Sequence, residues 1–208
     1  MNQTHEGLLL VVSGPAGVGK GTIDKNLLDN HQNMCLSVSA TTRKPRPGEI
    51  DGVHYFFVDE EKFNRMIEEN AFLEYMNVFG MNYYGTPRAF VEERVHAGKD
   101  VLLEIDVNGA LAVKKAYPEA VLIFIAPPNM GALKERLLNR NTETPEQMEK
   151  RLSTAYSEVL QMKHYDYVVV NDILDEAIRN MESIIRTEKC RVSRNKALIE
   201  EFEKIGDR

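Results

Sequence analysis

The sequence predicts an α/β fold in three layers, with a parallel β-sheet between helices, and two observations carry this prediction. Short apolar runs alternate along the chain with segments of helical periodicity, beginning with residues 8–13. Continuous apolar runs are typical of strands buried on both faces, and strands separated by helices pair in parallel. The first run also leads directly into a glycine-rich turn at 14–21 that a helical pattern follows, an order found at the carboxyl edge of such sheets.

Length and composition are those of a single domain with small inserted subdomains. The chain has 208 residues, of which 43% are apolar and 28% charged, and its net charge is −6. Because the balance is acidic and no apolar run approaches a membrane span, we expect neither nucleic acid nor a membrane as a partner. Cys35 and Cys190 lack metal or redox spacing, and no signal-peptide pattern opens the chain, which favours the cytoplasm.

The core elements are expected towards both ends of the sequence. The first are a strand at 8–13, a helix at 19–30 with Ile23, Leu27 and Leu28 on one side, and a strand at 35–39. The next are a strand at 101–106, a helix to about 116, a strand at 121–126, and a helix with Met130, Leu133 and Leu137. A capping box at 144–147 begins another helix, and a strand follows at 167–170. Asn171-Asp172 then opens a final helix, which continues through a basic run to Ile199 and Phe202.

Residues 39–97 differ in composition from both flanks and predict an inserted lobe. A loop at 41–49 carries three cations and two prolines, and the prolines exclude a helix. The further expected elements are a strand at 54–58, a helix capped by Asp59 that carries Phe63, Met66 and Ile67, a strand at 72–79, a tight segment at 82–85, and a helix to about 97 with Thr86 as its cap and Pro87 at its first position.

The glycine-rich turn fits the phosphate-binding pattern G-x-x-x-x-G-K-[ST] in all but its last position, where Gly21 stands and Thr22 follows. Such a turn curls backbone N–H groups around phosphate oxygens, the following helix adds its positive end, and the lysine adds a point charge. The turn therefore predicts a site for a nucleoside triphosphate. The expected contacts are Gly14, Pro15, Ala16, Gly17, Val18, Gly19, Lys20, Gly21 and Thr22.

Two carboxylates close the apolar run at 101–106. In a strand, Glu104 and Asp106 would point the same way at the sheet's carboxyl edge, where ligands of such sheets bind. An acid at the end of an apolar strand suits a group that organises Mg²⁺ through water. The alternative is that Asp106 only caps the next helix. Asp106 also opens a D-x-x-G pattern, but the N-K-x-D of GTPases is missing from the sequence.

Arginines at two places suit phosphate chemistry. Arg43 and Arg46 lie in the stiff loop before Tyr55, and arginine forks bind phosphate oxygens bidentately. Arg140 and Arg151 stand on either side of the capping box, where a closing lid would bring cations onto a transferring phosphoryl group. The alternative for each group is an ordinary solvated charge.

With these residues placed, the chain resembles the guanylate kinases over residues 7–186. The segments that carry the resemblance are residues 13–22, 37–49, 82–86, 103–106, 140–144 and 170–172. The resemblance implies a P-loop kinase fold and one guanylate-kinase-like domain over 1–208. Its parts would be a core of 1–37, 98–137 and 156–208, an α+β GMP-binding lobe at 38–97, and a small helical lid at 138–155.

The resemblance also implies an activity and a set of site residues. The enzyme would phosphorylate GMP, and dGMP, with ATP and Mg²⁺, as a monomer or homodimer. For GMP, the resemblance implies Ser39, Glu74 and Thr86 at the guanine, Arg43, Arg46, Tyr55 and Tyr84 at the phosphate, and Glu104 and Asp106 as further contacts. For catalysis it implies Lys20, Arg43, Arg46, Arg140 and Arg151. Asn171 and Asp172 would lie beside the ATP, and the metal would be bound by Thr22 and, through water, by Asp106.

Two rival functions remain open on the sequence alone. One is a guanylate-kinase-like scaffold module that binds proteins without turnover, against which the intact glycines and Lys20 argue. The other is a different monophosphate kinase such as an adenylate kinase, which the Gly21-Thr22 ending suggests and the guanine-side residues oppose. The chain departs from the family pattern at three places. Gly21 replaces the usual hydroxyl residue, a variant familiar among guanylate kinases; Met81 is one extra residue; and Asn108 stands where glutamine is common.

Overall fold

The computed structural model describes residues 6–78, 80–138 and 145–206. Its centre is a parallel five-stranded sheet in the order β2-β7-β1-β8-β9. The strands are β1 Leu9–Ser13, β2 Met34–Leu36, β7 Asp100–Glu104, β8 Val121–Ala126 and β9 Tyr167–Val170. All of β1 and β8 is buried, as the continuous apolar runs predict. The expected parallel sheet is confirmed.

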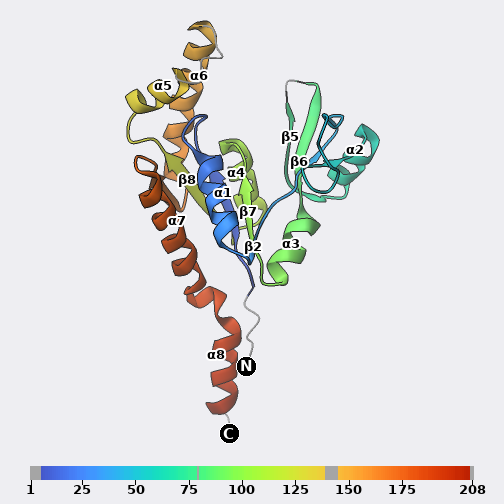
Figure 1. Cartoon of the computed structure of the whole chain (residues 1–208). Helices are drawn as coiled ribbons and strands as arrows, with labels where there is room; N and C mark the ends of the chain where they lie inside the picture. The colour runs from blue at the N-terminus through green and yellow to red at the C-terminus, as the bar shows by residue number, and fades with distance from the viewer. Residues whose placement is uncertain (1–5, 79, 139–144, 207–208) are drawn as a thin grey trace.

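Helices cover both faces of this sheet, which makes the three layers. Alternate residues of β1 point to opposite faces, so that Leu10 joins one buried cluster and Val11 the other. The helices of the first cluster are α1 Lys20–Asn30, α5 Met130–Leu138, α6 Pro145–Val159 and α7 Leu174–Lys189, and those of the second are α3 Arg88–His96 and α4 Val107–Ala116. Figure 1 shows α1 and α7 on one side of the strands and α4 behind them.

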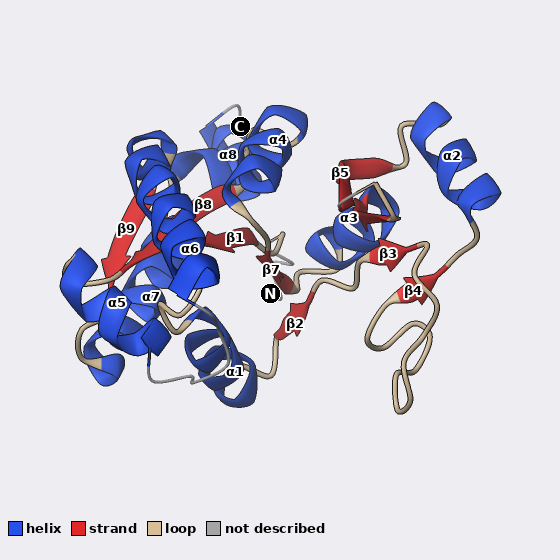
Figure 2. Ribbon diagram, turned by 90° about the horizontal axis from the view of Figure 1, so that it is seen from above, coloured by secondary structure: helices blue, strands red, loops and turns tan. Residues whose placement is uncertain are grey.

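A second, smaller sheet forms the lobe, in the order β4-β3-β6-β5. Its strands are β3 Ala40–Thr41, β4 Phe56–Phe57, β5 Phe72–Val78 and β6 Asn82–Pro87, and α2 Glu60–Glu68 packs on it. The rings of Phe63 and Phe72 stack at 4.5 Å between centroids and form its buried centre with Ala40. As predicted, Asp59 caps α2 by accepting a hydrogen bond from the backbone N–H of Lys62 at 2.7 Å. Figure 2 shows the lobe beside the main sheet rather than above it.

Several expected boundaries in the lobe, and one just before it, were wrong. The strand expected at 35–39 ends at Leu36, and that expected at 54–58 is only Phe56–Phe57. The expected tight segment at 82–85 belongs to β6, which pairs antiparallel with β5 from Phe72↔Pro87 to Val78↔Asn82. Antiparallel pairing between these two consecutive strands overrides the local turn signal at 82–85.

The expected cap of α3 was also wrong. α3 begins at Arg88, and Pro87 stands at the cap position instead of the first helical position. Thr86 lies in β6, and its hydroxyl donates to a Glu74 side-chain oxygen at 2.6 Å instead of accepting from the helix. A hydroxyl committed across the strand pair is not available to the helix end, which explains the difference.

Three boundaries differ in the rest of the chain. The final helix, expected to open at Asn171-Asp172, begins at Leu174 with Ile173 at its cap position. The strand expected to reach Asp106 ends at Glu104, so the argument that the two side chains share one strand face does not hold. The final helix does not continue to Phe202: α7 ends at Lys189, and α8 Lys196–Gly206 follows after a 3₁₀ turn. α8 stands away from the body in Figure 1. The expected capping box begins at Thr144, outside the described residues.

Candidate active site at the carboxyl edge of the sheet

The loop between β1 and α1 has the conformation its glycines allow. Gly14, Gly17 and Gly19 have φ values of 153°, 82° and 99°, which side-chain-bearing residues rarely adopt. A Cβ on Gly14 would lie 2.3 Å from the Ile125 carbonyl oxygen, because the loop passes close to β8. α1 begins directly after Gly19, so its first N–H groups face the loop's interior.

Lys20 closes the loop on itself. Its Nζ donates to the Gly14 carbonyl oxygen at 2.7 Å and approaches that of Pro15 at 3.4 Å. The same nitrogen lies 3.9 Å from an Oε atom of Glu104, the last residue of the neighbouring strand β7. A lysine in this place carries its positive charge to whatever anion the loop holds.

Asn171 holds the loop from the end of β9. Its side-chain N–H donates to the Val18 carbonyl oxygen at 2.8 Å, across 153 residues of sequence. A Cβ on Gly19 would lie 2.5 Å from the same nitrogen, so only glycine fits there. Arg136 of α5 in turn donates to the Asn171 carbonyl oxygen at 2.8 Å. Asn171 therefore supports the loop, whereas its neighbour Asp172 is exposed.

A buried carboxyl group lies behind the loop. Asp24, one turn along α1 from Lys20, is 4% exposed. Burial, with the nearby charge of Glu104, raises the pKa of Asp24 to about 8, although Lys20 acts in the opposite direction. Within the described residues neither Asp24 oxygen accepts from a donor group, although the Glu104 carboxyl group lies within hydrogen-bonding reach of it.

Asp106 caps α4, as the alternative to a role in organising Mg²⁺ predicts. Its Oδ1 accepts from the Gly109 backbone N–H at 2.9 Å. Its charge is also felt by Glu158 of α6, whose pKa is raised mainly by burial while Lys20 acts to lower it. Glu158 thus faces the same space as Lys20 and Asp106. The expected metal contact Thr22 is exposed beside this space.

The residues expected to bind guanine lie together where the lobe meets the core. Thr86 is fully buried and bonded to Glu74, and the two stand opposite each other in the β5–β6 pair. Because Ala40 pairs with Gly85, Ser39 continues that register opposite Thr86. Burial and the charge of Asp106 raise the pKa of Glu74, and the hydrogen bond from Thr86 acts to lower it. Lobe and core thus meet at Glu74.

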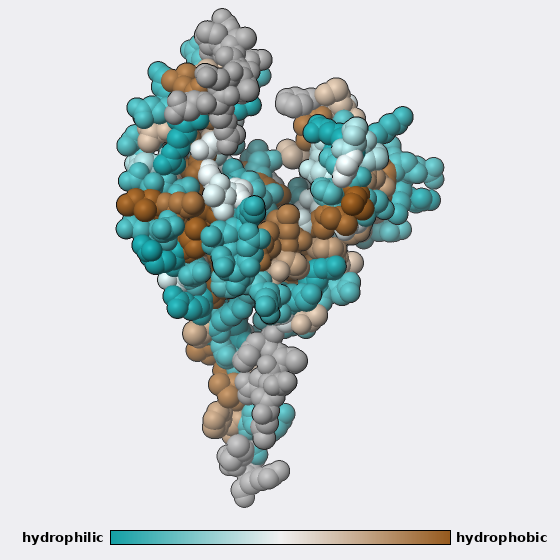
Figure 3. Space-filling model, viewed as in Figure 1, coloured by the Kyte–Doolittle hydropathy of each residue, from teal (hydrophilic) through white to brown (hydrophobic). Residues whose placement is uncertain are grey.

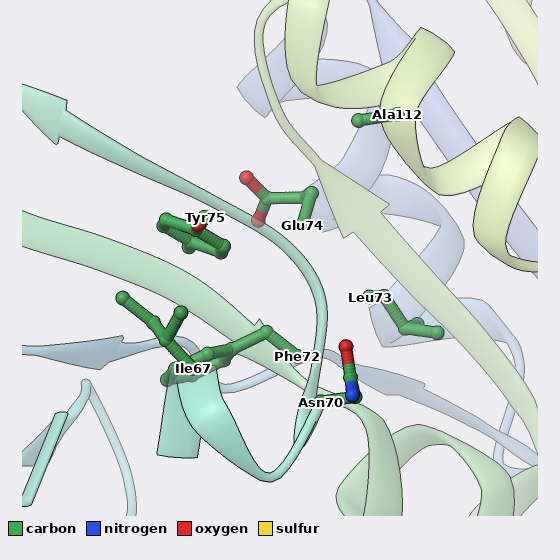
Figure 4. A pocket seen from close by; sticks show the side chains of 7 residues that line it. All are labelled: Ile67, Asn70, Phe72, Leu73, Glu74, Tyr75 and Ala112. Carbon is green, nitrogen blue, oxygen red and sulfur yellow. The ribbon is translucent and has the colours of Figure 1, made fainter. Parts of the chain in front are cut away.

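Glu74 also lines a cavity of about 210 Å³ between β5, the end of α2 and α4 (Figure 4). In that view its carboxyl group projects beside the Tyr75 ring, with Ala112 of α4 beyond it. The cavity is lined by Ile67, Asn70, Phe72, Leu73, Glu74, Tyr75 and Ala112. Ser39 and Thr86 do not line this cavity, so of the three residues expected to bind guanine Glu74 alone is among its lining residues.

A cationic and aromatic group forms the lobe's second feature. The Arg43 guanidinium lies 5.4 Å from the centroid of the Tyr55 ring, which meets the Tyr84 ring edge-on at 5.9 Å. Arg43 Nη2 donates to Glu49 at 2.8 Å, and this contact lowers the pKa of Glu49 to about 2. The other Glu49 oxygen accepts from the Arg46 backbone N–H at 2.7 Å. The loop is therefore pre-formed, with Arg43, Tyr55 and Tyr84 gathered.

The lobe and the α5–α6 arm face each other across an open space. Figure 3 shows the molecule hollowed between them, above the end of the main sheet. Arg151 lies on α6 with its side chain exposed. Arg140, the other expected lid cation, lies outside the described residues. The structure therefore brings most of the predicted residues to one edge of the sheet but leaves the lobe and the α5–α6 arm apart.

Comparison with known proteins identifies this arrangement. A family model described as guanylate kinase matches residues 6–188. The chain belongs to the guanylate kinase family. It is 52% identical to the guanylate kinase of Caldanaerobacter subterraneus subsp. tengcongensis, over 95% of this chain and 96% of that one. It is also 52% identical to the guanylate kinase of Clostridioides difficile, over 93% and 94% of the two chains.

Solved structures agree with the sequences. The crystal structure of guanylate kinase from Anaplasma phagocytophilum superposes with a TM-score of 0.69 at 36% identity, covering 91% of this chain and 90% of the other. The family, the P-loop kinase fold and the enzyme class expected from the sequence are thereby confirmed. The comparisons do not favour the scaffold or adenylate kinase alternatives.

Three charged residues near the phosphate loop were not marked by the sequence patterns. Arg136 and Glu158 sit on helices where charged residues are common, and no local signal marks them. Asp24 did leave a signal, since it interrupts the apolar face of α1 between Ile23 and Leu27. An acid on a buried helix face, one turn from a phosphate-loop lysine, is a position worth testing in any such sequence.

Proposed function

We propose that this chain transfers the γ-phosphoryl group of ATP to GMP or dGMP, with Mg²⁺ accompanying the ATP. The observation that carries this proposal is the Glu74–Thr86 pair, buried at the lobe–core join, at the same edge of the sheet as the Lys20 loop. A carboxylate accepts from guanine N1–H and the exocyclic amine, whereas adenine offers the opposite pattern at that edge. Because mismatched polar groups would be left buried and unpaired, discrimination of about 10⁴ is within reach.

The remaining residues divide between the two substrates. Arg43, Tyr55 and Tyr84 would hold the GMP phosphate with Arg46, and the Lys20 loop would hold the ATP phosphates, with Asn171 keeping the loop in shape. This corresponds to the division into a core, a GMP-binding lobe at 38–97 and a lid at 138–155. Arg140 and Arg151 would approach the transferring group from the lid side.

The reaction needs no covalent intermediate. A phosphate monoester is already an anionic nucleophile, so catalysis consists of aligning it with the γ-phosphorus and neutralising charge with Lys20 and the arginines. The open space between the arms would close on both substrates and exclude water.

The oxygen donors beside the loop fit Mg²⁺. Glu104 ends β7 beside Lys20, and Asp24 has two buried oxygens that accept from no donor group in the described part of the chain. A hard cation of this kind takes one or two carboxylates together with phosphate oxygens and water. When bound, it would neutralise phosphate charge. The expected contacts Thr22 and Asp106 flank the same space.

A coupled assay of ADP formation tests the function directly. The protein is mixed with ATP, Mg²⁺ and one acceptor at a time: GMP, dGMP, AMP or UMP. Turnover confined to GMP and dGMP is the expected result. Turnover of AMP would favour an adenylate kinase activity, and no turnover with any acceptor would favour a scaffold module.

A further inference from the structure

Two acidic side chains behind the phosphate loop have an unusual environment. Asp24 on α1 is almost completely buried, and within the described residues no donor group reaches its oxygens; its close polar neighbour is the Glu104 carboxyl group. Glu104, at the end of β7, acts electrostatically on Asp24 and lies 3.9 Å from Lys20. Two carboxyl groups held together in a partly buried place without a cationic partner for Asp24 destabilise a fold, and a divalent cation that displaced the shared proton would stabilise both.

Gly21 leaves room next to this pair. Phosphate-binding loops carry a hydroxyl residue at this position, and that hydroxyl binds Mg²⁺. Among the residues that the structure describes, a Cβ on Gly21 would meet Glu104 Oε2 at 4.0 Å and no nearer side-chain atom. Asp24 follows Gly21 by three residues on α1 and therefore lies on the same side of the helix. The place of the missing hydroxyl thus opens towards Glu104, with Asp24 one turn further along the same side of α1.

We propose that Asp24 and Glu104 together replace the missing hydroxyl and form the protein's part of the site for the Mg²⁺ that accompanies ATP. The inference rests on the proposed function, which places ATP on this loop. In the part of the chain that the structure describes, no three His, Cys, Asp or Glu residues gather as a metal site. The site would therefore be completed by phosphate oxygens and water, and would form only with the nucleotide.

Lys20 fits this arrangement. Without nucleotide, its ammonium group lies against the loop carbonyls and near Glu104, where it offsets part of the pair's negative charge. When Lys20 engages the phosphates, the two carboxyl groups lose that compensation, and a divalent cation supplies it instead. In this arrangement Glu104 would face the cation across the space at Gly21. Asp24 would add its negative charge from α1.

Electron paramagnetic resonance with Mn²⁺ as the probe tests this without turnover. Free Mn²⁺ is titrated against protein saturated with AMP-PNP, in the absence of GMP. For Asp24→Asn we expect the Mn²⁺ dissociation constant to rise by about 10-fold or more, as for supporting carboxylates of metal sites. Asp29→Asn, an exposed change on the same helix, is the control and should stay within about 2-fold of wild type.

A second measurement separates a metal role from a structural one. Binding of metal-free AMP-PNP in EDTA should be unchanged in Asp24→Asn, because the phosphate loop itself is intact. Unaltered Mn²⁺ affinity in Asp24→Asn would overturn the proposal, and so would an equal loss of metal-free nucleotide binding. GMP turnover by the wild-type enzyme tests the proposed function separately, so the two can fail independently.

Restoring the hydroxyl provides the final test. Gly21→Ser has room for its side chain, and in the Asp24→Asn background it should recover most of the lost Mn²⁺ affinity. Gly21→Ala in the same background adds a Cβ without the oxygen and should recover none. If serine and alanine behave alike, Asp24 and Glu104 do not replace the hydroxyl, and the proposal is wrong.

Discussion

At the scale of single residues, the site depends on a few charges whose environments differ sharply. Lys20 is held by carbonyl oxygens of its own loop, Glu74 is buried beside a hydroxyl, and Arg43 is set by Glu49 and two aromatic rings. Each contact fixes a side chain before substrate arrives. Pre-organised charge of this kind needs little rearrangement during the reaction, which is where such sites gain most of their rate.

Removing the lysine tests the ATP side. Lys20→Ala should lower kcat by about 10²-fold or more, because no other group in the loop carries its charge to the transferred phosphoryl. Circular dichroism and thermal unfolding should match wild type. Lys25→Ala, exposed on the same helix, is the control and should retain full activity. Wild-type turnover by a folded Lys20→Ala protein would contradict the assignment.

Neutralising Glu74 tests the guanine side. Glu74→Gln keeps the shape and the bond with Thr86 but turns one acceptor into a donor facing the guanine N1–H. We expect the KM for GMP to rise by about 10-fold or more, with the KM for ATP changed less than about 2-fold. Glu68→Gln, exposed on α2, serves as the control. Equal increases in both KM values would place Glu74 outside the guanine site.

The buried Asp24 predicts a pH-dependent stability. Its pKa rises from 3.8 to about 8 on folding, so between these values the folded state holds a proton that the unfolded state has lost. Stability therefore falls as pH rises through this window. Asp24→Asn removes the effect and should raise the melting temperature, by more at pH 8 than at pH 5. The control Asp29→Asn, an exposed change, should shift the melting temperature by the same small amount at pH 5 and pH 8. An equal shift at the two pH values in Asp24→Asn would mean that the pKa of Asp24 is not raised on folding.

At the scale of elements, helix ends and strand pairs place the site residues. α1 begins at the loop, α4 begins at Asp106, and β5 pairs with β6 so that Glu74 meets Thr86. The patterns predicted the helices and most strands correctly, because periodicity and capping are local. They misplaced the start of α3, because the Thr86 hydroxyl is used by a residue of another strand.

The cap of α4 gives a prediction at this scale. Asp106→Ala should lower the free energy of unfolding by about 1 kcal/mol, since the bond to Gly109 is lost. Asp106→Asn keeps an oxygen acceptor and should stay within about 0.5 kcal/mol of wild type. Urea denaturation followed by circular dichroism measures both. Equal destabilisation by the two changes would mean that the charge of Asp106, not its cap, matters for stability.

At the scale of the whole molecule, the lobe and the α5–α6 arm stand on either side of the sheet's carboxyl edge (Figure 1). Glu74 and Thr86, which we propose bind guanine, lie on the lobe side of this space, and the phosphate loop lies on the core side. Phosphoryl transfer requires the two substrates in line and shielded from water. In the described residues, no helix is long and apolar enough to cross a membrane.

Closure of the lobe and the α5–α6 arm around the substrates gives the prediction at this scale. The radius of gyration from small-angle X-ray scattering should fall when AMP-PNP, Mg²⁺ and GMP are added together, because lobe and lid would then both contact ligand. GMP alone should produce a smaller decrease, and AMP a negligible one. An unchanged radius in the ternary complex would mean that the arms already stand at their working distance.

The sequence by itself determined the parallel sheet, the phosphate loop, most helices and the family, because these follow from local periodicity, glycine placement and contiguous motifs. Only the tertiary structure decided that Asn171 holds the loop at Val18, that Thr86 serves Glu74 rather than a helix end, and that Asp24 lies near Glu104. These contacts join residues from different elements. They depend on which strands become neighbours, and the burial that perturbs Asp24 arises only when the whole sheet and its helices pack together.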